Sequence, residues 1–139
     1  MTERSLHLAQ HEAAHVVVGV ALGLRLRRAV VGYHVQDGVE MDGFAWFTNH
    51  GSPFAHAVMF AAGIALDKAH DDSSPADAAL CREIVQTDDN IRTCVRIAKL
   101  ILSSSKAIHK RVTMALLERN LNGRDIAALA RGQKLTERE

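Results

Sequence analysis

The sequence predicts an α+β fold that is mostly helical, with a small sheet of two or three strands in its first half. The chain is 47% hydrophobic, rich in alanine and leucine, and its apolar residues recur at helical spacing over most of its length. One stretch, from about residue 26 to residue 48, instead carries β-branched and aromatic residues around a turn signal. A chain of 139 residues has the length of one domain with its own core, so we expect a single domain over residues 1–139.

The first predicted helix covers about Ser5–Leu22 and stops at Gly23. Strand patterns follow over Leu26–Val35 and Gly43–Thr48, and Asp37-Gly38 is a turn signal between them. We expect these strands to pair in an antiparallel sheet.

A long apolar helix is expected next, over Phe54–Ala69. Its middle, Ala61–Ala65, consists of small residues apart from Ile64, so it should let the first helix approach closely. Pro75 is well placed in the first turn of another helix. The remaining helices are predicted at Ala76–Gln86, Asp89–Ser103, Lys106–Asn120 and, as a short one, after Gly123.

The chemistry of the chain centres on the first helix, which contains His11-Glu12-Ala13-Ala14-His15. This is the HExxH pattern. Histidines four residues apart lie on one face of a helix and can bind one zinc ion, while the glutamate beside them can reach a water held by the metal. The flanking residues are apolar, and a buried helix with three such polar groups needs a partner that satisfies all of them. The other interpretation is that ordinary hydrogen bonds satisfy the two histidines.

A catalytic zinc site normally has a third protein ligand and an open position for water. The extended pattern HExxHxxGxxH is excluded, because Val18 and Ala21 stand where it needs Gly and His. Asp77, Asp88 and Asp89 remain as candidates near the starts of predicted helices. Each could equally be an acid that is favoured at a helix N-terminus for electrostatic reasons.

The segment Leu8–Val17, with HEAAH at its centre, resembles the start of the peptidase domain of the FtsH-type ATP-dependent zinc metalloproteases, whose motif reads HEAGH. Ala62–Lys68 is similar to the GGRAAEE helix of that family. In the family an aspartate ligand follows this helix after a small-residue loop, with a small residue four positions later. Asp77 with Cys81 matches that order best, and Asp89 with Thr93 matches it less well.

The resemblance covers about residues 6 to 105 and implies an FtsH-peptidase-like helical domain that hydrolyses peptide bonds. It implies Zn²⁺ held by His11, His15 and Asp77, with Glu12 as general base. It also implies a substrate strand that pairs with the edge strand Gly43–Thr48. The other interpretation of this strand is a core strand that supplies Phe44, Trp46 or Phe47 to packing. Ala14 replaces the family's glycine. The AAA ATPase module is absent, and no G-x-x-x-x-G-K motif occurs. We therefore expect peptides or unfolded proteins as substrates, with either a homo-oligomer or a separate ATPase as partner.

Two other functions remain open: a non-enzymatic helical interaction module with a vestigial or absent metal site, and a zinc hydrolase acting on something other than protein.

The net charge of +1 favours neither nucleic acid nor an anionic membrane surface as a partner. The longest apolar run is too short to span a bilayer, and no signal peptide is evident. Cys81 and Cys94 are expected to be buried and reduced, which with these features predicts a cytoplasmic protein.

Overall fold

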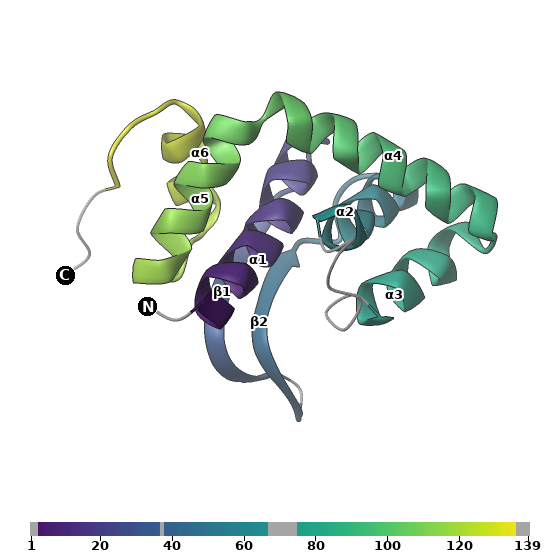
Figure 1. The fold of residues 1–139 in the computed structure, drawn as a ribbon, viewed down its shortest axis with the longest axis horizontal. Coiled ribbons are helices and arrows are strands. Elements are labelled where there is room, and N and C mark those ends of the chain that lie inside the picture. Colours follow the sequence, from purple (N-terminus) through teal and green to yellow (C-terminus); the bar gives the residue numbers. More distant parts are fainter. Residues whose placement is uncertain (1–2, 37, 67–74, 136–139) are drawn as a thin grey trace.

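The structure is a computed structural model, and it describes residues 3–36, 38–66 and 75–135 (Figure 1). Within these residues six helices accompany one two-stranded antiparallel sheet, so the predicted mostly helical α+β class is confirmed and the sheet has the smaller of the two expected sizes. The elements are α1 (Glu3–Ala21), β1 (Leu26–Gln36), β2 (Val39–Phe47), α2 (Pro53–Leu66), α3 (Pro75–Val85), α4 (Asp88–Ser104), α5 (Lys106–Glu118) and α6 (Gly123–Ala130).

Helix α1 ends at Ala21, one residue before the predicted end and just before Gly23. Gly23 has a φ of +83°, a left-handed conformation that glycine adopts without steric cost. The chain turns back there, and the Leu24 amide donates to the Gly19 carbonyl at 2.9 Å. This turn directs the chain into β1.

The hairpin is longer than predicted on its second strand. β2 begins at Val39, four residues before the expected start at Gly43, because its pairing with β1 continues almost to the turn, where Gln36 faces Val39. Asp37 of the predicted turn lies outside the described residues. On its other side β1 forms a bridge between Ala29 and Leu121. Among the described residues β2 pairs with β1 alone, which leaves its second edge without a strand.

Helix α2 begins at Pro53, where the Ser52 hydroxyl accepts a hydrogen bond from the Ala55 amide at 3.1 Å. The predicted end at Ala69 lies outside the described residues, as do the last two residues of Ala62–Lys68 and the loop before Pro75. The small residues of α2 are buried as expected: Ala61, Ala62 and Gly63.

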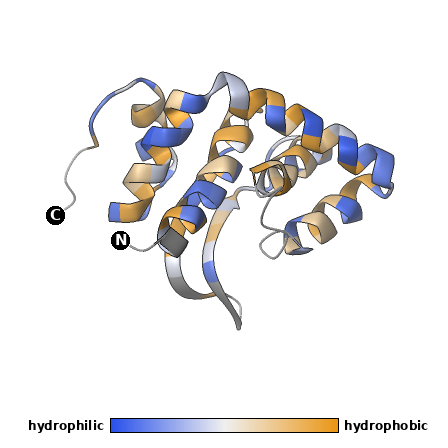
Figure 2. Cartoon of the chain, viewed as in Figure 1, coloured by the Kyte–Doolittle hydropathy of each residue, from blue (hydrophilic) through white to orange (hydrophobic). Residues whose placement is uncertain are grey.

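Helix α1 lies between two hydrophobic cores. Ala13 and Val16 face a core shared with the sheet, α5 and α6, while Ala14 and Val18 face a core shared with α2, α3 and α4. Helices α4 and α5 cover one side of the molecule, and blue and orange segments alternate along both of them as expected of amphipathic helices (Figure 2). The HEAAH segment therefore lies between the two hydrophobic cores.

Cys81 and Cys94 are both free and buried in the second core, in agreement with the sequence. Among the described residues no helix has the length and apolar character needed to cross a bilayer.

Candidate metal centre

Helix α1 presents His11 and His15 on one buried face. Their exposed fractions are 8% and 4%, and their Nε2 atoms lie 3.2 Å apart. The Nδ1 atom of His15 lies 2.8 Å from the carbonyl oxygen of Met59 in α2. Because a carbonyl can only accept, this contact places the His15 proton on Nδ1 and leaves Nε2 of the neutral ring with a lone pair. The ring is thus held in the tautomer that a metal ligand needs.

Asp77, in the first turn of α3, brings a carboxylate to the same point. Its Oδ2 atom lies 3.0 Å from Nε2 of His11 and 3.2 Å from Nε2 of His15. This oxygen is buried, yet it meets the geometric conditions of a hydrogen bond with neither nitrogen. When His11 carries its proton on Nδ1 as His15 does, three lone pairs converge here, and a proton or a metal ion bound among them would stabilise the cluster.

Gly63 of α2 makes this convergence sterically feasible. A Cβ atom at that position would lie 2.2 Å from Oδ2 of Asp77 and 2.7 Å from Cε1 of His11. Both distances are well below van der Waals contact, so no side chain fits between α2 and the cluster. Among the small residues of α2, Gly63 thus has a specific role, because it leaves the space in which Asp77 and His11 approach each other.

Burial and the neighbouring charged groups shift the pKa values of His11, His15 and Asp77 in opposite directions. Burial lowers the pKa of His15, but the Asp77 carboxylate, with Glu12 and the Met59 carbonyl, more than offsets this and raises the pKa to about 9. Burial and the neighbouring His15 lower the pKa of His11, but Asp77 and Glu12 together outweigh them, so this pKa is raised as well. Burial alone would raise the pKa of Asp77, whereas the two imidazoles lower it to about 2. Without a metal the cluster therefore binds a proton at neutral pH.

Glu12 lies beside the cluster and next to the sheet. Its carboxylate forms a group with His11 and His15 in which the ligand atoms lie within 4.8 Å of one another, and its exposed fraction is 6%. A Cβ atom added to Gly43 of β2 would lie 3.2 Å from Cγ of Glu12. Helix α1 thus places this carboxylate between the histidine pair and β2.

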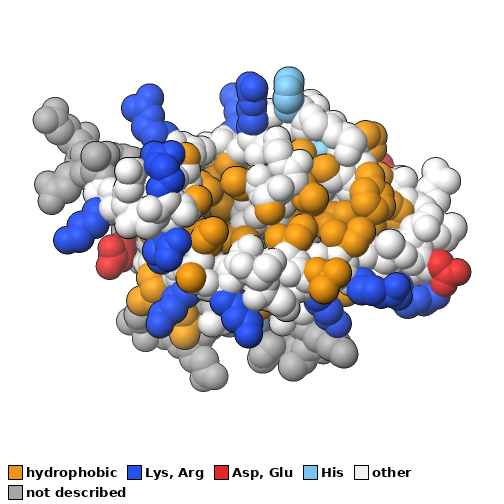
Figure 3. Space-filling model, turned by 90° about the horizontal axis from the view of Figure 1, so that it is seen from above, with side chains coloured by type: hydrophobic (Ala, Val, Ile, Leu, Met, Phe, Trp, Pro, Cys, Tyr) orange, Lys and Arg blue, Asp and Glu red, His pale blue; other side chains and the backbone are white. Residues whose placement is uncertain are grey.

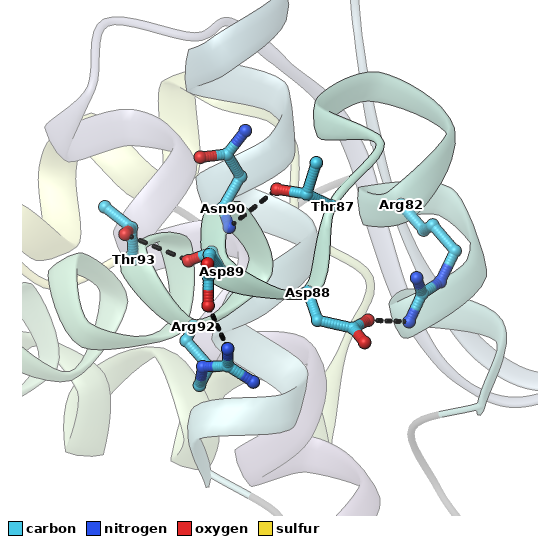
Figure 4. A network of polar contacts seen from close by, with 7 residues as sticks. All are labelled: Arg82, Thr87, Asp88, Asp89, Asn90, Arg92 and Thr93. Atoms are coloured by element: carbon cyan, nitrogen blue, oxygen red, sulfur yellow. Dashed lines mark hydrogen bonds and ion pairs between the residues drawn. The ribbon is translucent and has the colours of Figure 1, made fainter.

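Asp88 and Asp89, the other two sequence candidates, have different surroundings (Figure 4). Both begin α4, where the Thr87 hydroxyl caps the helix by accepting from the Asn90 amide. Asp88 pairs with Arg82 and Asp89 with Arg92, and both carboxylates are largely exposed. Asp88 and Asp89 are therefore acids at a helix N-terminus, each paired with an arginine. A helix N-terminal acid was the other interpretation that the sequence allowed for them.

Sequence reasoning did not identify two contributors to this region. The Met59 carbonyl is a backbone group, so no residue type could mark it. His109 in α5 donates from Nε2 to the Gln10 carbonyl at 2.9 Å and ties α5 to α1. Lys110 and Arg111 follow it directly, so the local composition gave no signal of a packing role.

The remaining histidines that the structure describes in side-chain detail lie in other settings. His7, one turn before His11, is half-buried. His56 donates from Nε2 to the carbonyl oxygen of His50 at 2.8 Å.

Comparison of the sequence with protein-family models and with curated proteins found no match.

Proposed function

We propose that this chain is a zinc-dependent metallopeptidase of the FtsH peptidase type, with His11, His15 and Asp77 as metal ligands and Glu12 as general base. The observation that carries the proposal is the convergence of two Nε2 atoms and one carboxylate oxygen within 3.2 Å of one another in a buried position. Two histidines and one carboxylate are a common ligand set of catalytic zinc.

The spacing of the three atoms fits Zn²⁺. Tetrahedral coordination with bonds of 2.0–2.1 Å separates neighbouring ligand atoms by about 3.3 Å. The three separations here are 3.0, 3.2 and 3.2 Å. Three protein ligands also leave a fourth position, as a catalytic site requires and a closed structural site does not.

The roles of the side chains follow from these positions. Zn²⁺ bound by this cluster supplies a Lewis acid that polarises a carbonyl oxygen and lowers the pKa of a water molecule. The Glu12 carboxylate accepts a proton from the attacking water as its oxygen bonds to the carbonyl carbon. Glu12 then returns that proton to the amine nitrogen when the C–N bond breaks. Met59 supports the reaction indirectly by orienting the His15 ring.

The sheet supplies a surface for an extended substrate. The second edge of β2 carries no partner strand within the described residues, and Gly43 brings this strand against Glu12. A peptide that adds to this edge by main-chain hydrogen bonds would run past the general base. Phe47 of the same strand is buried in the core, whereas Trp46 is 43% exposed, so the strand serves both packing and the surface. Unfolded protein segments are the substrates that this geometry favours.

The test is proteolysis of an unfolded, fluorescently labelled casein by the full chain loaded with zinc. We expect slow, chelator-sensitive cleavage. Glu12→Gln should retain zinc and lose at least about a hundredfold in rate, because only the proton-transfer group is removed. Glu83→Gln, which changes a carboxylate on α3 outside the cluster, is the matched control and should cleave at the wild-type rate. Full activity in a zinc-loaded Glu12→Gln protein would refute the assigned base.

Zinc content and cleavage together separate the alternative functions. Zinc below about a tenth of an equivalent after supplementation would favour the non-enzymatic module. A protein that binds zinc but leaves casein and short peptides intact would favour a hydrolase acting on another substrate.

A further inference from the structure

The net charge of +1 conceals a strong separation of charge along the chain. Residues 88–135 contain ten Lys and Arg against four Asp and Glu, so the excess of acids lies in the rest of the sequence. The segment from Asn90 to Leu117 has six Lys and Arg and no acid at all. This segment forms most of α4 and α5.

The solvent-facing cations of α4 and α5 form one pair on each helix. Arg96, Lys99, Lys106 and Lys110 are exposed, and within the described part of the chain none of them forms an ion pair with a carboxylate. Arg96 and Lys99 are three residues apart, and Lys106 and Lys110 are four apart, so each pair shares a helix face. Like charges at these spacings destabilise a helix, and an external anion would relieve that repulsion.

Exposed apolar side chains lie among these cations. Leu100, next to Lys99, is 67% exposed, and Met114, one turn after Lys110, is 46% exposed. Figure 3 shows the side of the molecule that α4 and α5 cover: hydrophobic side chains form a band across it, Lys and Arg lie along its margins, and few acids are visible. An apolar surface bordered by flexible cations is typical of proteins that rest in the headgroup region of a membrane.

We propose that the surface formed by Arg96, Lys99, Leu100, Lys106, Lys110 and Met114, here termed the α4–α5 surface, docks on an anionic phospholipid membrane. The cations would lie among lipid phosphates and carboxylates while Leu100 and Met114 enter the headgroup region. The β1–β2 hairpin extends from the opposite side of the molecule (Figure 1). Docking in this way would keep the open edge of β2 turned away from the bilayer.

A lipid surface explains the apolar residues better than a nucleic acid does. Residues 88–135 contain no Phe, Tyr or Trp, so this surface offers no aromatic side chain on which bases could stack. A purely electrostatic contact with phosphates would also gain nothing from Leu100 or Met114.

The experiment is flotation of the full chain with vesicles of phosphatidylcholine alone and of phosphatidylcholine with about a third phosphatidylserine. We expect binding to the anionic vesicles only, weakened by salt. The double variant Arg96→Glu/Lys99→Glu should reduce partitioning more than about tenfold, since each cation near an anionic surface contributes about a fivefold factor. Arg25→Glu/Arg28→Glu makes the same change in net charge near and in β1 and should bind as the wild type does.

Leu100→Ser tests the apolar contribution without a change of charge, and it should reduce partitioning severalfold. No binding to anionic vesicles, or an equal loss in the two double variants, would overturn the proposal. Unchanged binding by Leu100→Ser would overturn it too, as would equal competition by polyglutamate or duplex DNA, because each result indicates a general polyanion site. Circular dichroism and thermal unfolding identify any variant that fails to fold, in which case Arg96→Gln/Lys99→Gln replaces the charge reversal.

Discussion

Oδ2 of Asp77 lies 3.0 Å from Nε2 of His11, although the hairpin and α2 separate these residues along the chain. The contact joins the first turn of α3 to the middle of α1, and both elements reach it by packing against α2. A helix N-terminal acid is ordinarily a capping or solvent-facing group. Here the fold turns one such acid towards two buried imidazoles, and this relationship distinguishes Asp77 from Asp88 and Asp89.

Gly63→Ala should abolish tight zinc binding while the domain stays folded. The added methyl would lie 2.2 Å from Oδ2 of Asp77, so the carboxylate must move away from the histidine pair. Replacing a helical glycine with alanine otherwise favours the helix by about 1 kcal/mol. We therefore expect a loss of zinc affinity of at least about tenfold with no large fall in the melting temperature of the metal-free protein. Isothermal titration with Zn²⁺ and thermal unfolding measure the two effects.

Gly19→Ala is the matched control for that variant. A Cβ atom there would lie 2.4 Å from Cζ of Phe47 and 3.2 Å from Cγ of Met59, which are core side-chain atoms and not the ligand atoms. This variant should lose stability and retain its zinc affinity. The same loss of affinity in both variants would show that α1–α2 packing in general, and not the space at Gly63, controls the site.

The free energy of unfolding of the metal-free chain should depend on pH through the cluster. The folded pKa of His15 is about 9, above its ordinary 6.5, so its stabilising contribution is complete below pH 6.5 and is lost as the pH rises through 9. The folded pKa of Asp77 is about 2, below its ordinary 3.8, so its contribution is present above pH 3.8 and is lost as the pH falls through 2. Stability from these groups is therefore greatest between pH 3.8 and 6.5.

Urea unfolding of chelator-treated protein at about pH 6 and about pH 9.5 tests this dependence. We expect the midpoint to fall at the higher pH. In Asp77→Asn the fall should be much smaller, because the group that raises the His15 pKa most is gone. An equal fall in Asp77→Asn would assign the pH dependence to other groups.

The sequence predicted more of the fold than of the site. Gly23 and Pro75 marked a helix end and a helix start correctly, because their backbone restrictions act locally. The start of β2 was predicted four residues late, since strand pairing and not local composition extends the hairpin to Val39.

The two histidines could be placed on one face from their spacing alone. The choice among Asp77, Asp88 and Asp89 could not be made from the residues, because all three stand near helix starts. Only the packing of α3 against α2 separates them, and that is a tertiary property. The Met59 carbonyl and the space at Gly63 depend on the same packing.

Gly43→Ala should lower peptidase activity without loss of zinc. The new methyl would lie 3.2 Å from Cγ of Glu12 and 3.0 Å from the Val30 carbonyl oxygen, so Glu12 or the strand must shift slightly. A general base that moves by a fraction of an ångström loses rate, and we expect a reduction of about tenfold in kcat. The zinc-loaded variant can be assayed on the labelled casein, with zinc content measured on the same sample. Unchanged kcat would indicate that β2 does not position Glu12.

The most direct test of the metal centre is the zinc stoichiometry of Asp77→Asn compared with that of Asp89→Asn. Both variants remove one carboxylate charge from the first turn of a helix, but only Asp77 approaches the imidazoles. After zinc supplementation and gel filtration, we expect about one equivalent in the wild type and in Asp89→Asn, and less than about a tenth of an equivalent in Asp77→Asn. One full equivalent in Asp77→Asn, or none in the wild type, would contradict a zinc centre formed by His11, His15 and Asp77.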